Sequence, residues 1–174
     1  MTMEKTMKII LLLVLACTGC ATNAHAQRNS GRLSLGAGLI YKNGMDVTLA
    51  YEHEMDYRNA WEFFVDGYLQ WAECASCGHI CPDSFWRNYR TYGFGVAYKP
   101  CVTRGRNHYG SLRIGASAGS DTKKFLGGLH LGYEHNYVLR SGWTLYWQVK
   151  SDVMIKGADV LRAGVVLGVK LPVK

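Results

Sequence analysis

The sequence lacks several features that define common classes of protein. After its N-terminal segment it has no apolar run of about 18 residues, the minimum for a membrane-spanning helix, which excludes a helical membrane protein. The basic residues are dispersed, and the two short groups Arg104-Gly105-Arg106 and Lys123-Lys124 are typical of solvated turns. The formal net charge of +7 therefore does not predict direct binding of nucleic acid.

Catalytic motifs are also missing. The chain has no nucleophile elbow, no His-Glu-x-x-His sequence and no glycine-rich phosphate loop. The six histidines are scattered, and His53, His130 and His135 fall in predicted strands, where interface or lumen positions are expected. We therefore expect no enzyme activity, no catalytic residue and no cofactor.

The N-terminal segment has the composition of an export signal. Lys5 and Lys8 precede an apolar run from Ile9 to Ala16, and Ala24-His25-Ala26 fits a small-x-small cleavage site. This run is shorter than the ~20 residues that span a bilayer. We predict a signal peptide over residues 1–26 and one mature domain over residues 27–174.

A second processing route stays open. Val14-Leu15-Ala16-Cys17 resembles a bacterial lipoprotein box, in which Cys17 would be acylated and become the new N-terminus. Either route exports the chain and places the later cysteines in an oxidising compartment.

The mature chain alternates between apolar and polar or small residues almost throughout, which predicts strand after strand. Leu33, Leu35 and Leu39, for example, alternate with serine and glycine. Asn43-Gly44 follows as a hairpin signal, because both residues tolerate positive φ. The predicted strands cover residues 32–42, 46–54, 61–71, 91–99, 112–119, 129–139, 143–153 and 161–171.

The polarity of this alternation distinguishes two kinds of barrel. A soluble β-sandwich or ligand-binding barrel would place the apolar set inside, whereas a membrane barrel places it outside. The apolar faces carry large aromatic residues near strand ends, as interfacial girdles do: Tyr41, Trp61, Trp71, Tyr98, Tyr137 and Trp143. We therefore predict an all-β fold, an eight-stranded antiparallel up-and-down β-barrel of the outer-membrane type.

The opposite faces combine glycine with charges of both signs, which suits a narrow lumen in which charges must pair. The predicted lumen charge network comprises Arg32, Lys42, Asp46, Glu52, Glu54, Glu62, Asp66, Lys99, Arg113, Glu134, Lys150, Asp152, Arg162 and Lys170. Side chains fill a barrel of eight strands, so solute conduction is not expected. The even strand number places both termini on the periplasmic side, with turns near residues 56–59, 103–108 and 140–142, and the long loop at Cys74–Ser84 outside.

That loop contains the most conspicuous local motif, Cys74-x-x-Cys77-x-His79-x-Cys81. Cys74, Cys77 and Cys81 are disulfide candidates, since exported thiols usually oxidise. The alternatives are zinc bound by Cys74, Cys77, His79 and Cys81, and free thiols. Cys101 lies at the far end of the fourth strand, too distant for a disulfide with the loop.

Three segments resemble the TraO family of conjugative-transposon proteins from Bacteroidota: residues 97–101 (AYKPC), residues 127–134 (GGLHLGYE), and the tail from QVKSDVMIKG at 148–157 to GVVLGVK at 164–170. The resemblance spans nearly the whole mature chain. It implies an envelope component that acts in conjugal DNA transfer, with other conjugation-apparatus proteins and outer-membrane lipid as partners. It supplies no catalytic residues.

The sequence-based prediction is thus a non-enzymatic outer-membrane component of a conjugation apparatus. Two alternatives remain, a periplasmic or lipid-anchored β-barrel binding module and a membrane-embedded lipid-modifying enzyme. The C-terminal residues Leu171-Pro172-Val173-Lys174 lack the terminal aromatic residue that often signals barrel assembly.

Overall fold

The computed structural model describes residues 31–74, 77–81, 85 and 89–173. The predicted signal peptide and the acylation site Cys17 lie outside this range. Within these ranges the chain forms β1 Gly31–Ile40, β2 Gly44–Glu54, the short 3-10 helix η1 Asp56–Arg58, β3 Ala60–Gln70, β4 Tyr89–Lys99, β5 Cys101–Arg104, β6 His108–Ser120, β7 Phe125–Val138, β8 Thr144–Ile155 and β9 Leu161–Val173. Across the described ranges, no helix combines the length and apolar character that crossing a membrane requires.

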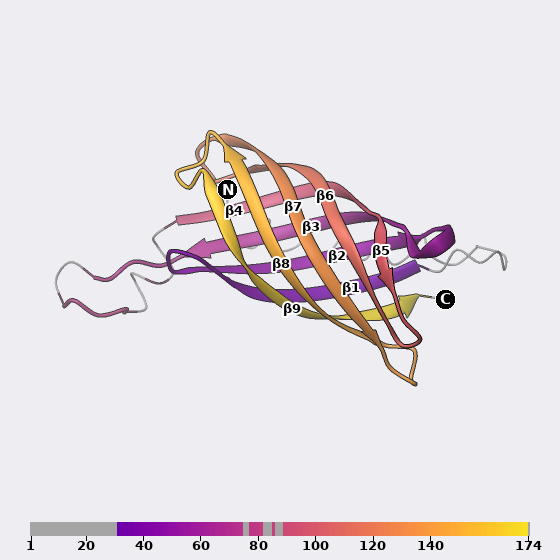
Figure 1. The fold of residues 1–174 in the computed structure, drawn as a ribbon. Helices are drawn as coiled ribbons and strands as arrows, with labels where there is room; N and C mark the ends of the chain where they lie inside the picture. Colours follow the sequence, from indigo (N-terminus) through magenta and orange to yellow (C-terminus); the bar gives the residue numbers. More distant parts are fainter. Residues whose placement is uncertain (1–30, 75–76, 82–84, 86–88, 174) are drawn as a thin grey trace.

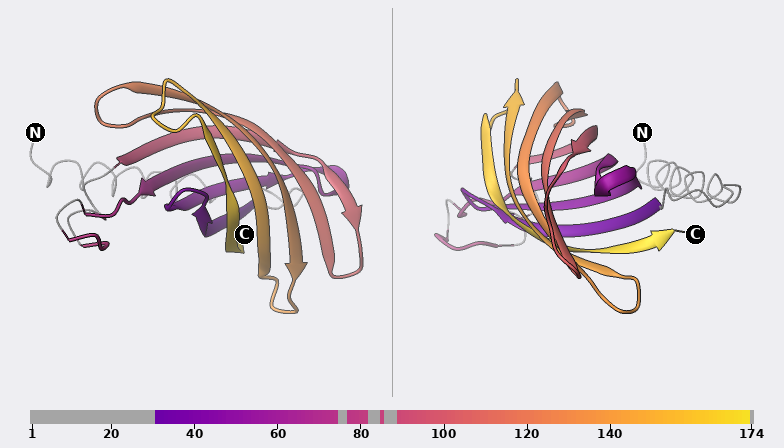
Figure 2. Two further views of the ribbon diagram at one scale, coloured as in Figure 1. Left: turned by 60° about the vertical axis from the view of Figure 1, so that its left-hand side comes forward. Right: turned by 45° about the vertical axis from the view of Figure 1, so that its right-hand side comes forward.

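The strands form one closed antiparallel sheet (Figure 1). Each strand pairs with the next along the chain except β4, which pairs with β6 instead of β5, and β1 pairs with the C-terminal strand β9. Figure 2 shows β9 running alongside β1, so the first and last of the described strands are neighbours in the barrel. β4 and β5 both pair with β6 and together occupy one strand position of the barrel wall. The barrel therefore has eight strand positions, and the predicted eight-stranded fold is confirmed.

Burial alternates along each strand, and it is inverted relative to a soluble protein. In β8, for example, Lys150 and Asp152 are buried while the neighbouring Val149 and Val153 are exposed. The same pattern holds around the barrel, with apolar side chains outside and polar ones inside. Such an exterior is stable only in an apolar environment.

Aromatic residues mark the outer surface near the end that carries η1. Trp61 and Tyr98 contact each other with ring centroids 5.1 Å apart, and Trp143 is half exposed. On β7 and β8, the His135 ring stacks on Trp147 with centroids 5.7 Å apart. These outward rings at strand ends are what a membrane interface favours.

Glycines make room in the lumen for large side chains. The Tyr146 ring lies against Gly168 and Gly36, where an added Cβ would stand 2.5 Å and 2.3 Å from the nearest atoms of that tyrosine. Phe64, only 1 % exposed, lies in the same way against Gly95. The glycine-rich faces predicted from the sequence therefore receive the aromatic residues of the interior.

Two local details differ from the sequence-based expectation. The first hairpin turns at Tyr41–Asn43 rather than at Asn43-Gly44: Lys42 and Asn43 adopt φ of 64° and 58°, and Gly44 already pairs with Ile40. In addition, Pro100 separates β4 from β5, but the same strand position of the barrel continues beyond it. The chain resumes as β5 and pairs with β6 across a bulge, so the following turn is shorter than predicted.

Candidate functional site

The lumen holds most of the charges that the sequence assigned to it. Thirteen of the fourteen predicted side chains point inward, and eleven of these are buried. Arg32 and Glu54 lie near the η1 end, with side chains 13 % and 17 % exposed, and form an ion pair of 2.8 Å. We call these thirteen residues the lumen network.

Lys42 is the exception and corrects the prediction. It lies in the exposed turn between β1 and β2, because the turn occupies residues 41–43 instead of 43–44. A shift of one residue in a strand or turn moves a side chain to the other face. Lys42 therefore contributes nothing to the lumen network.

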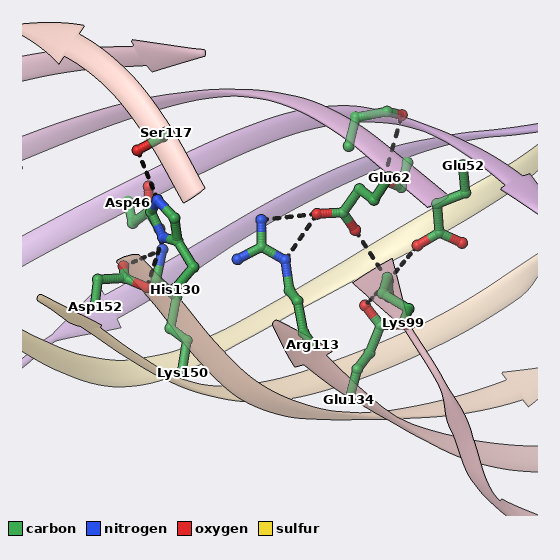
Figure 3. Close-up of polar contacts among 12 residues, drawn as sticks. Asp46, Glu52, Glu62, Lys99, Arg113, Ser117, His130, Glu134, Lys150 and Asp152 are labelled. Carbon is green, nitrogen blue, oxygen red and sulfur yellow. Dashed lines mark hydrogen bonds and ion pairs between the residues drawn. The ribbon is translucent and has the colours of Figure 1, made fainter. Parts of the chain in front are cut away.

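Lys99 is the centre of the network (Figure 3). Its ammonium Nζ contacts Glu52, lies 3.0 Å from Glu62 Oε2 and 2.5 Å from Glu134 Oε2. Glu52 and Glu62 are direct cross-strand partners of β2 and β3. Two carboxylates in that position repel each other, so Lys99 supplies the charge that allows them to be neighbours.

Two more cations complete this first cluster. Lys170 Nζ lies 2.7 Å from Glu52 Oε1 and also contacts Glu134. Arg113 donates from Nε and Nη2 to Glu62 Oε1, each at 2.7 Å. Three cations thus face three carboxylates, drawn from the six strands β2, β3, β4, β6, β7 and β9. The first cluster consists of Glu52, Glu62, Lys99, Arg113, Glu134 and Lys170.

A second cluster lies further toward the long-loop end of the barrel. Lys150 contacts Asp46 and lies 2.9 Å from Asp152 Oδ2. His130 Nδ1 is 2.8 Å from Asp152 Oδ1, and its Nε2 is 2.7 Å from Ser117 Oγ. Figure 3 shows these side chains converging from β2, β6, β7 and β8.

The Ser117–His130–Asp152 chain has the connectivity of a hydrolase triad, which the sequence did not reveal because the residues are spread over three strands. Catalysis by such a triad also needs N–H donors aimed at an oxyanion. Ser117 instead belongs to a strand paired on both sides, with Gly95 on β4 and Gly128 on β7. The backbone amides around it pair within the sheet, so the chain of hydrogen bonds is best explained as a structural part of the lumen.

Little space remains between these side chains. A cavity of about 10 Å³ lies near the η1 end, among Glu52, Lys99, Tyr109, Glu134 and Lys170. That volume accommodates about one water molecule. The described part of the lumen is therefore filled by its own side chains, which leave no pore for solutes between them.

The long-loop end of the lumen has its own polar contacts. The Arg162 guanidinium lies over the Tyr68 ring at 3.8 Å and donates to Thr91 Oγ1 at 3.0 Å. The Tyr68 hydroxyl donates to Asp159 Oδ2 at 3.0 Å. These contacts join β3, β4 and β9 across the mouth of the barrel.

The cysteine motif lies beyond that mouth. The Sγ atoms of Cys74, Cys77 and Cys81 all lie within 4.8 Å of one another. His79 is not part of this convergence, and its Nδ1 lies 2.5 Å from the carbonyl oxygen of Cys77. Cys101 begins β5 at the opposite end, where its thiol donates to Thr103 O at 3.4 Å.

Comparisons with known proteins identify the fold class. No family model matches the chain, and no curated protein matches it. Among solved structures, the chain is similar to a major outer membrane protein from Thermus thermophilus, with a TM-score of 0.62, 12 % identity, and coverage of 85 % of this chain and 100 % of that one.

Two further solved structures have the same architecture. Neisserial surface protein A gives a TM-score of 0.61 at 11 % identity, covering 85 % of this chain and 99 % of that one. The Yersinia pestis outer membrane protein Ail, in a phospholipid bilayer nanodisc, gives 0.56 at 12 % identity, covering 83 % and 99 %. The fold of this chain is therefore that of outer-membrane β-barrel proteins.

Proposed function

We propose that this chain is a closed, non-conducting outer-membrane barrel that anchors its loops at the cell surface and acts through protein contacts, without catalysis. The observation that carries the proposal is the combination of an apolar exterior with a lumen filled by paired charges. An apolar exterior suits lipid, and a filled lumen leaves the loops and rims as the surfaces that can bind a partner. A soluble ligand-binding barrel would need the reverse polarity.

The location is tested by membrane fractionation combined with a heat-modifiability gel. A folded barrel is expected in the outer-membrane fraction and should migrate differently before and after boiling. Recovery of the chain in the soluble fraction alone would contradict the proposed location.

The filled lumen is tested by reconstituting the purified chain in a planar bilayer. No discrete conductance steps are expected from the wild-type chain, because ions would have to displace the buried pairs of Lys99 and Lys170. Reproducible steps from a folded preparation would show an open pore and overturn this part of the proposal.

We further propose that the barrel serves the envelope side of a conjugal DNA transfer apparatus. This role is supported by the TraO-like segments at residues 97–101, 127–134 and 148–170. Three members of the first cluster, Lys99, Glu134 and Lys170, lie in these segments. Direct contact with DNA is not part of the proposal, because the basic residues outside the lumen are dispersed.

The test is deletion of the gene in a donor strain that carries the mobile element. Transfer frequency should fall and should return on complementation with the wild-type chain. A matched deletion in the recipient should leave transfer unchanged. Unaltered transfer from the deleted donor would overturn the conjugal role while leaving the barrel itself in place.

A further inference from the structure

The loop between β3 and β4 brings three cysteine sulfurs together outside the barrel. Cys74, Cys77 and Cys81 are close in sequence, but that spacing alone does not require their side chains to meet. In the structure their Sγ atoms lie within 4.8 Å of one another. Sulfur ligands ~2.3 Å from a tetrahedral zinc ion stand roughly 3.8 Å apart, so a small adjustment of the side chains would complete such a geometry.

The backbone of the loop explains why two of the three sulfurs converge. Gly78 N donates to Cys74 O at 2.9 Å, and Cys74 N donates to His79 O at 3.0 Å. Gly78 adopts φ of 66°, which favours glycine, although the space around it is open. These two bonds hold Cys77, Gly78 and His79 beside Cys74.

The third sulfur is held from the other side of the loop. Phe85 N donates to Cys81 O at 2.9 Å, and the Phe85 ring stacks on Trp71 with centroids 5.5 Å apart. Trp71 follows directly after β3, so this stack connects the Cys81 segment to the barrel. Figure 1 shows the loop extending beyond the barrel at the end opposite η1.

Among the described residues of the loop tip, apolar burial is slight. Ile80 is 54 % exposed, and Cys77 is exposed as well. A loop with so little buried apolar surface gains most from a cross-link or a bound ion that joins its segments. A disulfide would use two of the sulfurs and leave the third beside it, whereas a metal ion uses all three.

We propose that Cys74, Cys77 and Cys81 bind one Zn²⁺ ion as thiolates, with a fourth position open to water or to a donor from a bound partner. Thiolate sulfur is a ligand that zinc prefers, and binding releases the three thiol protons. His79 is not a ligand in this site, because its ring contacts the backbone of Cys77 instead of the sulfurs. The site is independent of the conjugal role proposed above.

The experiment uses the full mature chain, purified in detergent, reduced, and freed of reductant without oxygen. Co²⁺ serves as the spectroscopic probe, because thiolate-to-cobalt charge transfer reports sulfur ligation, and Zn²⁺ is then added to displace it. The wild type, the His79→Ala variant and the Cys101→Ser control should each bind a single equivalent. Cys77→Ser should bind Co²⁺ more weakly and with a weaker charge-transfer band, because one of the three thiolates is lost.

Two results with cobalt would overturn the proposal: the absence of a thiolate-to-cobalt band in the wild type, and a Cys77→Ser variant that binds Co²⁺ like the wild type.

A separate measurement uses the chain as cells make it. After acid quenching, alkylation under denaturing conditions without reductant should modify all three loop cysteines. A disulfide between any two of them would show that the loop is closed by oxidation instead of metal.

Discussion

Replacing Lys99 with methionine tests whether the first cluster supports the barrel. In the wild type, three cations balance three carboxylates, and Lys99 alone contacts Glu52, Glu62 and Glu134. Lys99→Met leaves two cations for three carboxylates, including the directly opposed pair Glu52 and Glu62. Removing one partner of a buried ion pair costs about 3–5 kcal/mol, because the remaining charge is buried without compensation.

The assay is reversible urea unfolding of the chain in lipid vesicles, followed by tryptophan fluorescence. Lys42→Met is the matched control, since it makes the same substitution in an exposed turn and should lie within about 0.5 kcal/mol of the wild type. Adding Glu52→Gln to Lys99→Met should recover part of the lost stability, because it restores the charge balance and removes one of the two opposed carboxylates, while Arg113 keeps Glu62 and Lys170 keeps Glu134. If Lys99→Met were no less stable than Lys42→Met, the first cluster would not be what stabilises the barrel.

Three further predictions concern other parts of the barrel. Gly168→Ala should destabilise the folded barrel by about 1–3 kcal/mol in the same urea assay, because its Cβ would meet Tyr146 and the backbone. Gly67→Ala is the control and should change little, since its Cβ would have nothing nearer than 4.0 Å. Equal effects would contradict the idea that Gly168 makes room for the Tyr146 ring. Ser117 should stay unlabelled by a fluorophosphonate probe, and labelling at that serine, detected by peptide mass spectrometry, would show a working nucleophile. The pKa of Asp121 lies below its usual value, because two backbone N–H groups of its turn donate to the carboxylate. The carboxylate therefore stabilises the turn at a pH above the unfolded pKa, and this stabilisation is lost as the pH falls through the lower folded pKa. NMR titration should find a midpoint below that of an unstructured aspartate, and a midpoint at or above it would count against this hydrogen bonding.

The architecture could be predicted because a period of two is a property of each strand by itself. Val149, Lys150 and Val153 already indicate the two faces of β8, and repetition over eight segments predicts a barrel with inverted polarity. The details that differed depend on exact turn positions. The turn at residues 41–43 places Lys42 outside the lumen. The pairing of β5 with β6 extends the sheet beyond Pro100.

The contacts inside the lumen could not be predicted, although its residues were. Which carboxylate meets which ammonium depends on strand tilt and stagger around the whole barrel. Lys99 and Glu134, for example, lie on strands that are not paired with each other. The hydrogen-bonded chain from Ser117 to Asp152 and the convergence of the three loop sulfurs arise in the same way, from distances that a linear sequence does not contain.

The position of Lys170 has a consequence for how the barrel is assembled. It lies on β9, which closes the barrel against β1, yet its partners Glu52 and Glu134 come from β2 and β7. A slip of β9 by one residue would turn this lysine toward lipid and leave the earlier strands with excess negative charge. Closure of the barrel in that register is therefore disfavoured electrostatically, so Lys170 helps to set the register in which β9 pairs with β1.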